Sequence, residues 1–231
     1  MNVASQKTGE DADAAARLPA HEVIYRQLRD LILFGDLAPG QAVTIQGLTD
    51  RLGAGMTPVR EAIRRLIAEG ALEFQGNRRV CVPELTADNI SELIVARQWL
   101  DPHLTRRATA LATAADLQNL EDLDTALDQA IDQGELRAYL ELNYRFHSMV
   151  YQIADAPILA QIADGLWLRF GPSLRVVCGR MGTQNLPDKH KDMLAAMRSG
   201  DEEAAAQAIH GDVTQGMEQM RQSMELGRKL R

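Results

Sequence analysis

The 231-residue sequence predicts a mainly α protein with two domains, in which three short helices and a β-hairpin precede an all-helical bundle. Residues that favour helices dominate, and aromatic residues make up only 4 % of the chain. Apolar residues recur at helical spacing almost throughout, whereas one alternating, β-branched stretch surrounds Gly76-Asn77. We therefore expect a disordered tail over residues 1–18, a first domain over 19–83 and a second over 84–231.

The first domain begins with two helices and a turn. Apolar residues at helical spacing predict a helix over 20–34, which the sequence FGDLAPG ends. A short helix follows over 44–52, and a Gly-Ala-Gly turn separates it from a third. In this third helix Thr57 has the character of an N-cap, Pro58 suits the first turn, and Gly70 marks the end. The hairpin around Gly76-Asn77 then completes the domain.

Three short helices followed by a hairpin are typical of a winged helix-turn-helix, which gives the arginines of the third helix a role. Arg60 and Arg64 lie one turn apart on the face opposite the apolar stripe. A recognition helix presents its N-terminal residues to base edges, while neighbouring basic groups hold phosphates. A lone pair of arginines would more simply be a solvated helix face, but the surrounding elements favour DNA binding.

Charge agrees with a DNA-binding first domain. The formal net charge is −7, yet residues 19–83 carry eight Lys/Arg against seven Asp/Glu, whereas residues 84–231 carry fifteen against twenty-two. Only the first domain can approach a polyanion without a penalty, provided that its basic residues gather on one face.

Membrane and secreted classes are not expected. No stretch approaches the roughly 18 consecutive apolar residues of a membrane span, and the N-terminal segment lacks the apolar core of a secretory signal. Cys81 and Cys178 lack metal-binding spacing and are expected to be free thiols. These features predict a cytoplasmic protein.

Residues 25–72 resemble the DNA-binding domain of the GntR family of bacterial transcription regulators. The resemblance lies in Gly-x-Leu-x-Pro-Gly after the first helix, a Leu-Gly turn, and Thr-Pro-Val-Arg-Glu-Ala at the start of the recognition helix. It implies that Thr57 and Arg60 contact the operator. It also implies that Arg64 or Arg65 and the wing residues Asn77, Arg78 and Arg79 lie near the DNA backbone or minor groove. Gly55 and Met56 replace the family's usual polar residue and arginine, and Arg79 replaces its wing glycine, so we expect a different operator half-site.

The second domain reads as helical throughout. Turn signals divide it into about six helices, near residues 112–115, 133–135, 155–157, 171–172, 179–187 and 199–201. It contains no Gly-rich phosphate loop and no Gly-x-Ser-x-Gly or His-Glu-x-x-His motif. A helical bundle with a pocket in its core is the expected architecture.

Two histidines and a carboxylate are the candidate functional residues of this bundle. Asn143 and His147 share one face of a largely apolar helix, His190 opens a later helix, and Asp212 lies on the inward flank of the last. A lone histidine on such a face is more often a hydrogen-bonded core residue.

The spacing of these residues resembles the FCD ligand-binding domain of the FadR-like branch of the same family. The resemblance implies a divalent ion such as Zn, Ni or Mn, held by Asn143, His147, His190 and Asp212, with Arg97 as an anchor for a small organic acid. Two positions are altered, because the family has Asp at position 143 and His at position 212. His210 is an alternative ligand, but it lies about 200° from Asp212 on the helical wheel, and the register favours Asp212.

The sequence therefore predicts a homodimeric, metabolite-responsive transcription regulator, not an enzyme, in which effector binding shifts the bundle and the spacing of two winged helices. A metal-dependent enzyme acting on small organic acids, with Asp101 or Glu141 as base, is one alternative. The others are a DNA-binding protein whose sensor pocket has lost its metal and an architectural protein without a sensor.

Overall fold

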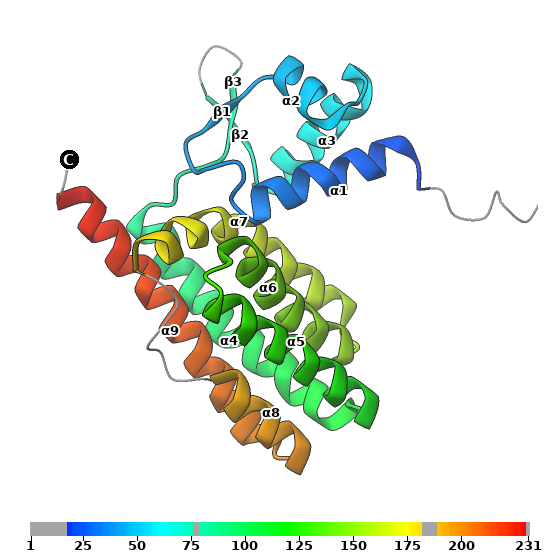
Figure 1. Cartoon of the computed structure of the whole chain (residues 1–231), viewed down its shortest axis with the longest axis vertical. Coiled ribbons are helices and arrows are strands. Elements are labelled where there is room, and N and C mark those ends of the chain that lie inside the picture. Colours follow the sequence, from blue (N-terminus) through cyan, green and yellow to red (C-terminus); the bar gives the residue numbers. More distant parts are fainter. Residues whose placement is uncertain (1–17, 76–78, 182–188, 230–231) are drawn as a thin grey trace, which may run out of the picture.

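The computed structural model describes residues 18–75, 79–181 and 189–229 of the chain. Figure 1 shows a small N-terminal domain seated on one end of a long helical bundle. All of the predicted N-terminal tail except Leu18 lies outside the described residues. No described helix is both long and apolar enough to cross a membrane.

The N-terminal domain contains the predicted three helices. The elements are α1 (Ala20–Leu33), β1 (Ala42–Val43), α2 (Ile45–Leu52), α3 (Met56–Ala68), β2 (Glu73–Gln75) and β3 (Arg79–Cys81). Thr44 caps α2, since its hydroxyl accepts the Gly47 N–H at 3.0 Å. The predicted cap of α3 was wrong. The helix begins at Met56 after Gly55, which makes no side-chain capping bond, so Thr57 lies inside the first turn.

The wing is a three-stranded sheet instead of the expected two-stranded hairpin. Strand β3 lies in the middle and is antiparallel to both neighbours, in the order β1-β3-β2. Cys81 is the partner of Ala42 on one side and of Glu73 on the other. Strand β1 is only two residues long, which is too short for alternation to be recognised in the sequence.

The second domain contains six described helices, as predicted. They are α4 (Ala87–Leu111), α5 (Ala114–Asp132), α6 (Leu136–Ile153), α7 (Pro157–Met181), α8 (Lys189–Ser199) and α9 (Glu202–Lys229). Capping boxes begin α4 at Thr86 and α5 at Thr113. Helix α8 lies at the end of the bundle far from the N-terminal domain, and α9 runs along its side (Figure 1).

The turn expected at residues 171–172 is absent, because α7 continues through Gly171 and Pro172. A Cβ atom on Gly171 would lie 2.4 Å from the carbonyl oxygen of Leu33. Glycine is therefore needed where the end of α1 approaches α7, and its role is close packing instead of chain reversal.

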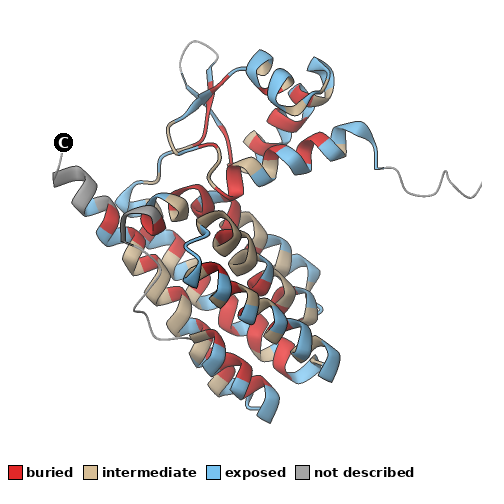
Figure 2. Cartoon of the chain, in the orientation of Figure 1, coloured by how far each residue is buried: buried red, intermediate tan, exposed pale blue. Residues whose placement is uncertain are grey.

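Both domains contain buried positions (Figure 2), but they differ in the kinds of side chain that they bury. Apolar residues fill the core of both domains, and the largest fully buried side chains include Phe146 and Phe170. Among the described residues, every buried polar or charged side chain lies in the second domain: Arg97, Asp101, Thr105, Thr109, Asp124, His147, Ser173, His190 and Ser223. Buried polar groups are costly unless they are partnered, so they indicate where the bundle has a function.

Helix α1 joins the domains by packing on α7. Arg29 of α1 donates to Asp164 of α7 at 2.6 Å and to the Tyr144 hydroxyl of α6 at 3.0 Å. After α1, Asp36 accepts hydrogen bonds from Arg137 of α6 and Arg175 of α7. The N-terminal domain is thus held by charged contacts to helices α6 and α7 of the bundle.

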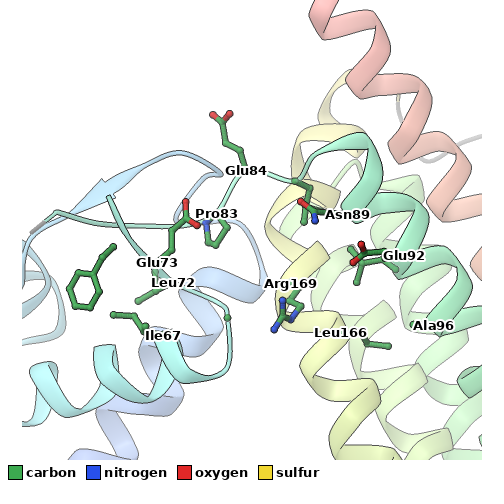
Figure 3. Close-up of a pocket in the computed structure, with 14 residues that line it drawn as sticks. Ile67, Leu72, Glu73, Pro83, Glu84, Asn89, Glu92, Ala96, Leu166 and Arg169 are labelled. Carbon is green, nitrogen blue, oxygen red and sulfur yellow. The ribbon is translucent and has the colours of Figure 1, made fainter. Parts of the chain in front are cut away.

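Beside this junction the two domains leave a cleft of about 700 Å³ (Figure 3). Its walls come from the end of α3, strand β2, the segment before α4, and helices α4 and α7. Arg169 lies between the domains, and its guanidinium would be 2.5 Å from a Cβ atom on Gly70. Glu73, Glu84 and Glu92 also line the cleft.

Candidate functional site

Helix α3 carries an exposed polar face. Thr57, Arg60 and Arg64 are exposed on it. Arg64 pairs with Glu61 at 2.7 Å, but its side chain remains 73 % exposed, and such a surface pair contributes little. Arg60 makes no ion pair within the described part of the chain. Two cations are therefore presented where a recognition helix needs them.

Arg65 behaves differently from the other arginines of α3. Its guanidinium donates to Glu22 of α1 at 2.9 Å and to Glu69 at 3.1 Å, and it lies 3.5 Å from the centre of the Tyr25 ring. The Tyr25 hydroxyl donates to Glu69 at 2.8 Å. The geometry gives Arg65 a structural role between α1 and α3. The DNA contact expected of it from the sequence stays a prediction.

The wing contributes one described basic residue. Arg79 begins β3 and is exposed. The other two predicted wing contacts, Asn77 and Arg78, lie outside the described residues.

In the bundle, three helices bring His147, His190 and Asp212 together. One potential ligand atom from each lies within 4.8 Å of the others. Nε2 of His147 is 3.3 Å from one Asp212 oxygen, and Nε2 of His190 is 3.7 Å from the other. We call these residues the histidine–aspartate cluster. Asn143, the fourth predicted ligand, is partly buried one turn before His147 on α6.

The electrostatics of the cluster favour ligand forms of both residue types. Burial lowers the pKa of the His147 imidazole more than the nearby Asp212 raises it, so this ring is held neutral. Burial alone would raise the pKa of Asp212, but the hydrogen bond to His147 and the influence of His190 hold it well below its usual range. A neutral imidazole and an ionised carboxylate are the forms that bind metal ions.

Two further residues orient His190. Its imidazole stacks on Phe146 with ring centres 4.0 Å apart. Its Nδ1 lies 3.3 Å from an oxygen of Asp124, a buried residue of α5. A carboxylate at the outer nitrogen of a histidine fixes the tautomer and directs Nε2 toward an ion. Asp124 was not among the site residues predicted from the sequence. An acidic residue within the apolar stripe of Leu120 and Leu127 could have indicated a buried carboxylate.

His210 lies apart from the cluster. It is exposed and borders a shallow surface groove of about 350 Å³ together with Trp99 of α4. Asp212 occupies the position facing the histidines, in agreement with its register on α9.

Arg97, the predicted effector anchor, is buried beside the cluster. Its Nε and Nη2 both donate to one oxygen of Asp101, at 3.0 and 2.7 Å. The guanidinium lies 4.9 Å from the ring centre of Trp167, and that ring is 5.1 Å from the ring of His147. Arg97 therefore belongs to the same polar core as the histidine–aspartate cluster, where it is paired internally.

The donor set of this cluster fits a borderline divalent ion. Two imidazoles and a carboxylate are ligands for Zn or Ni, and Mn also accepts such oxygen and nitrogen donors. The buried Nδ1 of His147 has no hydrogen-bond partner among the described residues, so these residues leave one nitrogen of this ring unsatisfied. With Asp124 behind His190, the arrangement includes the outer support that metal sites usually have.

Comparison with known proteins identifies both domains. Residues 20–82 match the family described as "Bacterial regulatory proteins, gntR family", and residues 92–215 match the FCD domain. The HTH-type transcriptional regulator McbR of Escherichia coli is 28 % identical over 189 residues, covering 80 % of this chain and 86 % of that protein. The HTH-type transcriptional repressor RspR of the same species is 24 % identical over 205 residues, covering 88 % and 90 %.

Solved structures agree with these matches. E. coli McbR/YncC has a TM-score of 0.83 at 26 % identity, covering 89 % of this chain and 99 % of that one. A putative GntR regulator from Rhodococcus sp. RHA1 shares the fold, with a TM-score of 0.73 at 21 % identity over 87 % of this chain and 96 % of that one. The domain matches and the shared structure confirm the predicted fold class. The matched families are transcription regulators, which excludes the metal-dependent enzyme. The chain belongs to the GntR family of bacterial transcription regulators and carries an FCD domain as its second domain.

Proposed function

We propose that this regulator is a homodimer whose bundle binds a divalent ion and a small organic acid, and that the acid changes the affinity of the winged helices for operator DNA. The observation that carries the proposal is the convergence of the buried His147 and His190 with the partly buried Asp212. Polar groups brought together from three helices into such surroundings are a poor way to gain stability. Their grouping is better accounted for by a ligand.

The proposed ion is Zn, Ni or Mn, held by His147, His190 and Asp212, with Asn143 as a fourth ligand from the turn before His147. When bound, such an ion supplies positive charge that attracts an anionic ligand. The cluster contributes one negative charge, so a divalent ion leaves a net positive site.

A carboxylate effector fits beside this site because Arg97 provides a second positive group. The Arg97 guanidinium and the His147 ring both pack against the ring of Trp167. Carboxylate recognition by an arginine is strong and directional. In the structure Asp101 occupies that role, so an effector carboxylate has to share Arg97 with it or replace it.

The proposed DNA surface consists of Thr57, Arg60, Arg64 and Arg79, together with the predicted wing residues Asn77 and Arg78. Thr57 and Arg60 stand near the start of α3, where a recognition helix meets base edges. We exclude Arg65 from this surface because α1 already holds its guanidinium.

A homodimer follows from the size of the DNA-binding unit, since one winged helix reads only a short half-site. Helix α4 offers an apolar contact surface, on which Val95 is 51 % exposed and Trp99 is 80 % exposed one turn later. We propose that this face meets its counterpart in a second copy. Light scattering at micromolar concentration should give twice the chain mass, and Trp99→Glu should give the monomer mass.

The proposed function is tested by metal analysis and operator titration of the full chain. Wild type should purify with, or take up, about one divalent ion per chain, and one of a panel of small acids should shift its operator affinity. His147→Ala/His190→Ala should lose both properties and keep operator binding, because the N-terminal domain is untouched. Equal metal content in the two proteins would refute the site, and an unchanged effector response would refute the coupling.

A metal-free sensor pocket is the second candidate, and one contact favours it. His147 and Asp212 already form a hydrogen-bonded pair at 3.3 Å, which can exist without an ion. This alternative predicts that a metal-stripped protein keeps its full effector response.

A further inference from the structure

One face of α4 carries four buried polar side chains in a row. Arg97, Asp101, Thr105 and Thr109 follow at four-residue spacing and are between 0 and 7 % exposed. Helix α4 packs against α6, α7 and α9, so this face looks into the bundle. A polar row on the inner face of a central helix is unusual, because buried positions normally hold apolar residues.

Two atoms in the middle of this row have no hydrogen-bond partner among the described residues. One is Oδ1 of Asp101, and the other is the hydroxyl of Thr105. Both residues are 0 % exposed. By contrast, the Thr109 hydroxyl donates to the Thr105 carbonyl oxygen at 2.8 Å. Buried polar atoms are almost always satisfied, so this adjacent pair requires a partner that the described residues do not supply.

The unsatisfied pair is continuous with the proposed effector site. The other oxygen of Asp101 accepts both hydrogen bonds from Arg97, the predicted effector anchor. A ligand whose carboxylate engages Arg97 therefore lies beside Asp101 and Thr105, which occupy the next two turns of the same face of α4.

We propose that Asp101 and Thr105 form a subsite for a hydroxyl group, so that the effector is a hydroxylated small carboxylic acid. A hydroxyl can donate to Oδ1 of Asp101 and accept from Thr105 at the same time. A second carboxylate is excluded, because it would meet the carboxylate of Asp101. This inference rests on the proposed function, since it names the chemistry of the same effector.

An ammonium group fits less well than a hydroxyl. The charge of Asp101 is already balanced by Arg97, so an added cation would be repelled by the guanidinium in a buried setting. An ammonium also cannot accept the hydrogen that the Thr105 hydroxyl offers. The neutral hydroxyl satisfies both atoms without adding charge.

The test uses calorimetry on the full, zinc-loaded chain with matched pairs of acids that differ by one hydroxyl. The pairs are propionate and lactate, butyrate and 3-hydroxybutyrate, and succinate and malate, with alanine and aspartate as amino counterparts. At least one hydroxy acid should bind roughly tenfold or more tightly than its deoxy partner, because a site built for a hydroxyl rejects the analogue that lacks it.

Variants assign that preference to the subsite. Thr105→Val keeps the volume and should reduce the preference to about threefold or less, with little change for the deoxy acid, and Thr105→Ser should restore it. The matched control is Thr109→Val, on the same face and equally buried, whose hydroxyl is used within the helix. It should leave the preference unchanged.

The outcomes separate the inference from the function beneath it. Acid binding without a hydroxyl preference, or a preference untouched by Thr105→Val, would overturn the subsite and leave acid sensing intact, with an internal water as the partner of the two atoms. Tighter binding of an amino acid would assign the subsite to an ammonium and overturn the hydroxyl. Failure of every acid to bind would overturn the proposed function and the inference with it.

Discussion

At the scale of single residues, the sequence predicted which polar side chains face the core of the bundle when apolar neighbours on the same helix defined their direction. His147 and Asp212 stand at inward positions of apolar helices, and the structure brings them together with His190. Contacts with residues on other helices could not be predicted from the sequence. Asp124 was missed because its histidine lies 66 residues away. The contact between Arg65 and Glu22 of α1 was not foreseen either, because the two residues are 43 positions apart.

Arg60 should dominate specific recognition at this scale. It is exposed on α3 and forms no ion pair among the described side chains, so Arg60→Ala should weaken specific operator binding by roughly 1–3 kcal/mol. Arg65→Ala is the control. It should lower the stability of the N-terminal domain and leave the preference for operator over random DNA largely unchanged. Gel-shift titrations against operator and random duplex measure the selectivity, and urea denaturation measures the stability. Intact selectivity in Arg60→Ala would remove α3 from the recognition role.

Asp124 should support metal binding without contacting the ion. Its oxygen lies 3.3 Å from Nδ1 of His190, and loss of such a partner typically lowers metal affinity about 10–100-fold. Asp124→Asn should show this loss in a competition titration with a zinc chelator. Asp128→Asn on the same helix is the control, because Asp128 makes a partly exposed ion pair with Lys191. Equal zinc affinity in the two variants would argue that Asp124 only packs.

At the scale of elements, helices were predictable wherever a cap and an apolar period agreed. Thr86 and Thr113 begin their helices with capping boxes, and all six described bundle helices were expected. Errors arose where local signals conflict with packing. Gly171 and Pro172 read as a turn by local chemistry, but the contact between α7 and α1 keeps them in a helix. Strand β1 depends on β3, which lies far along the chain.

Gly171 should be the most sensitive glycine of α7. A Cβ atom there would lie 2.4 Å from the Leu33 carbonyl oxygen, so Gly171→Ala must push α1 from α7 and should lower the free energy of unfolding by about 1–3 kcal/mol. Gly165→Ala, on the same helix with nothing within 4 Å of the added atom, should instead raise it by about 0.5–1 kcal/mol. Urea denaturation of both variants checks the opposite signs, and equal effects would contradict the close-packing role.

At the scale of the whole molecule, composition and the spacing of apolar residues predicted a winged helix-turn-helix and a helical bundle. The arrangement of these two domains depends on contacts that no local sequence pattern reveals. The ion pair between Arg29 and Asp164 joins residues 135 positions apart. The same junction adjoins the proposed sensor. Trp167 lies 5.1 Å from the His147 ring and 5.5 Å from the Tyr144 ring, and the Tyr144 hydroxyl accepts a hydrogen bond from Arg29. Packed side chains thus connect the cluster to α1, which in turn packs on α3.

Arg29 should therefore couple effector binding to operator affinity. Arg29→Ala removes the contacts of α1 with both Tyr144 and Asp164, while the residues proposed to bind the ion, the acid and the DNA remain. We expect wild-type metal content and acid affinity, but at least a threefold smaller effector-induced change in operator affinity, within the range over which coupling residues act. Arg26→Ala is the matched control, because Arg26 pairs only with Glu22 within α1 among the described ion pairs. Fluorescence anisotropy with labelled operator, with and without the acid, measures the response. A full response in Arg29→Ala would mean that the two domains communicate by another route, such as the Asp36 contacts with Arg137 and Arg175.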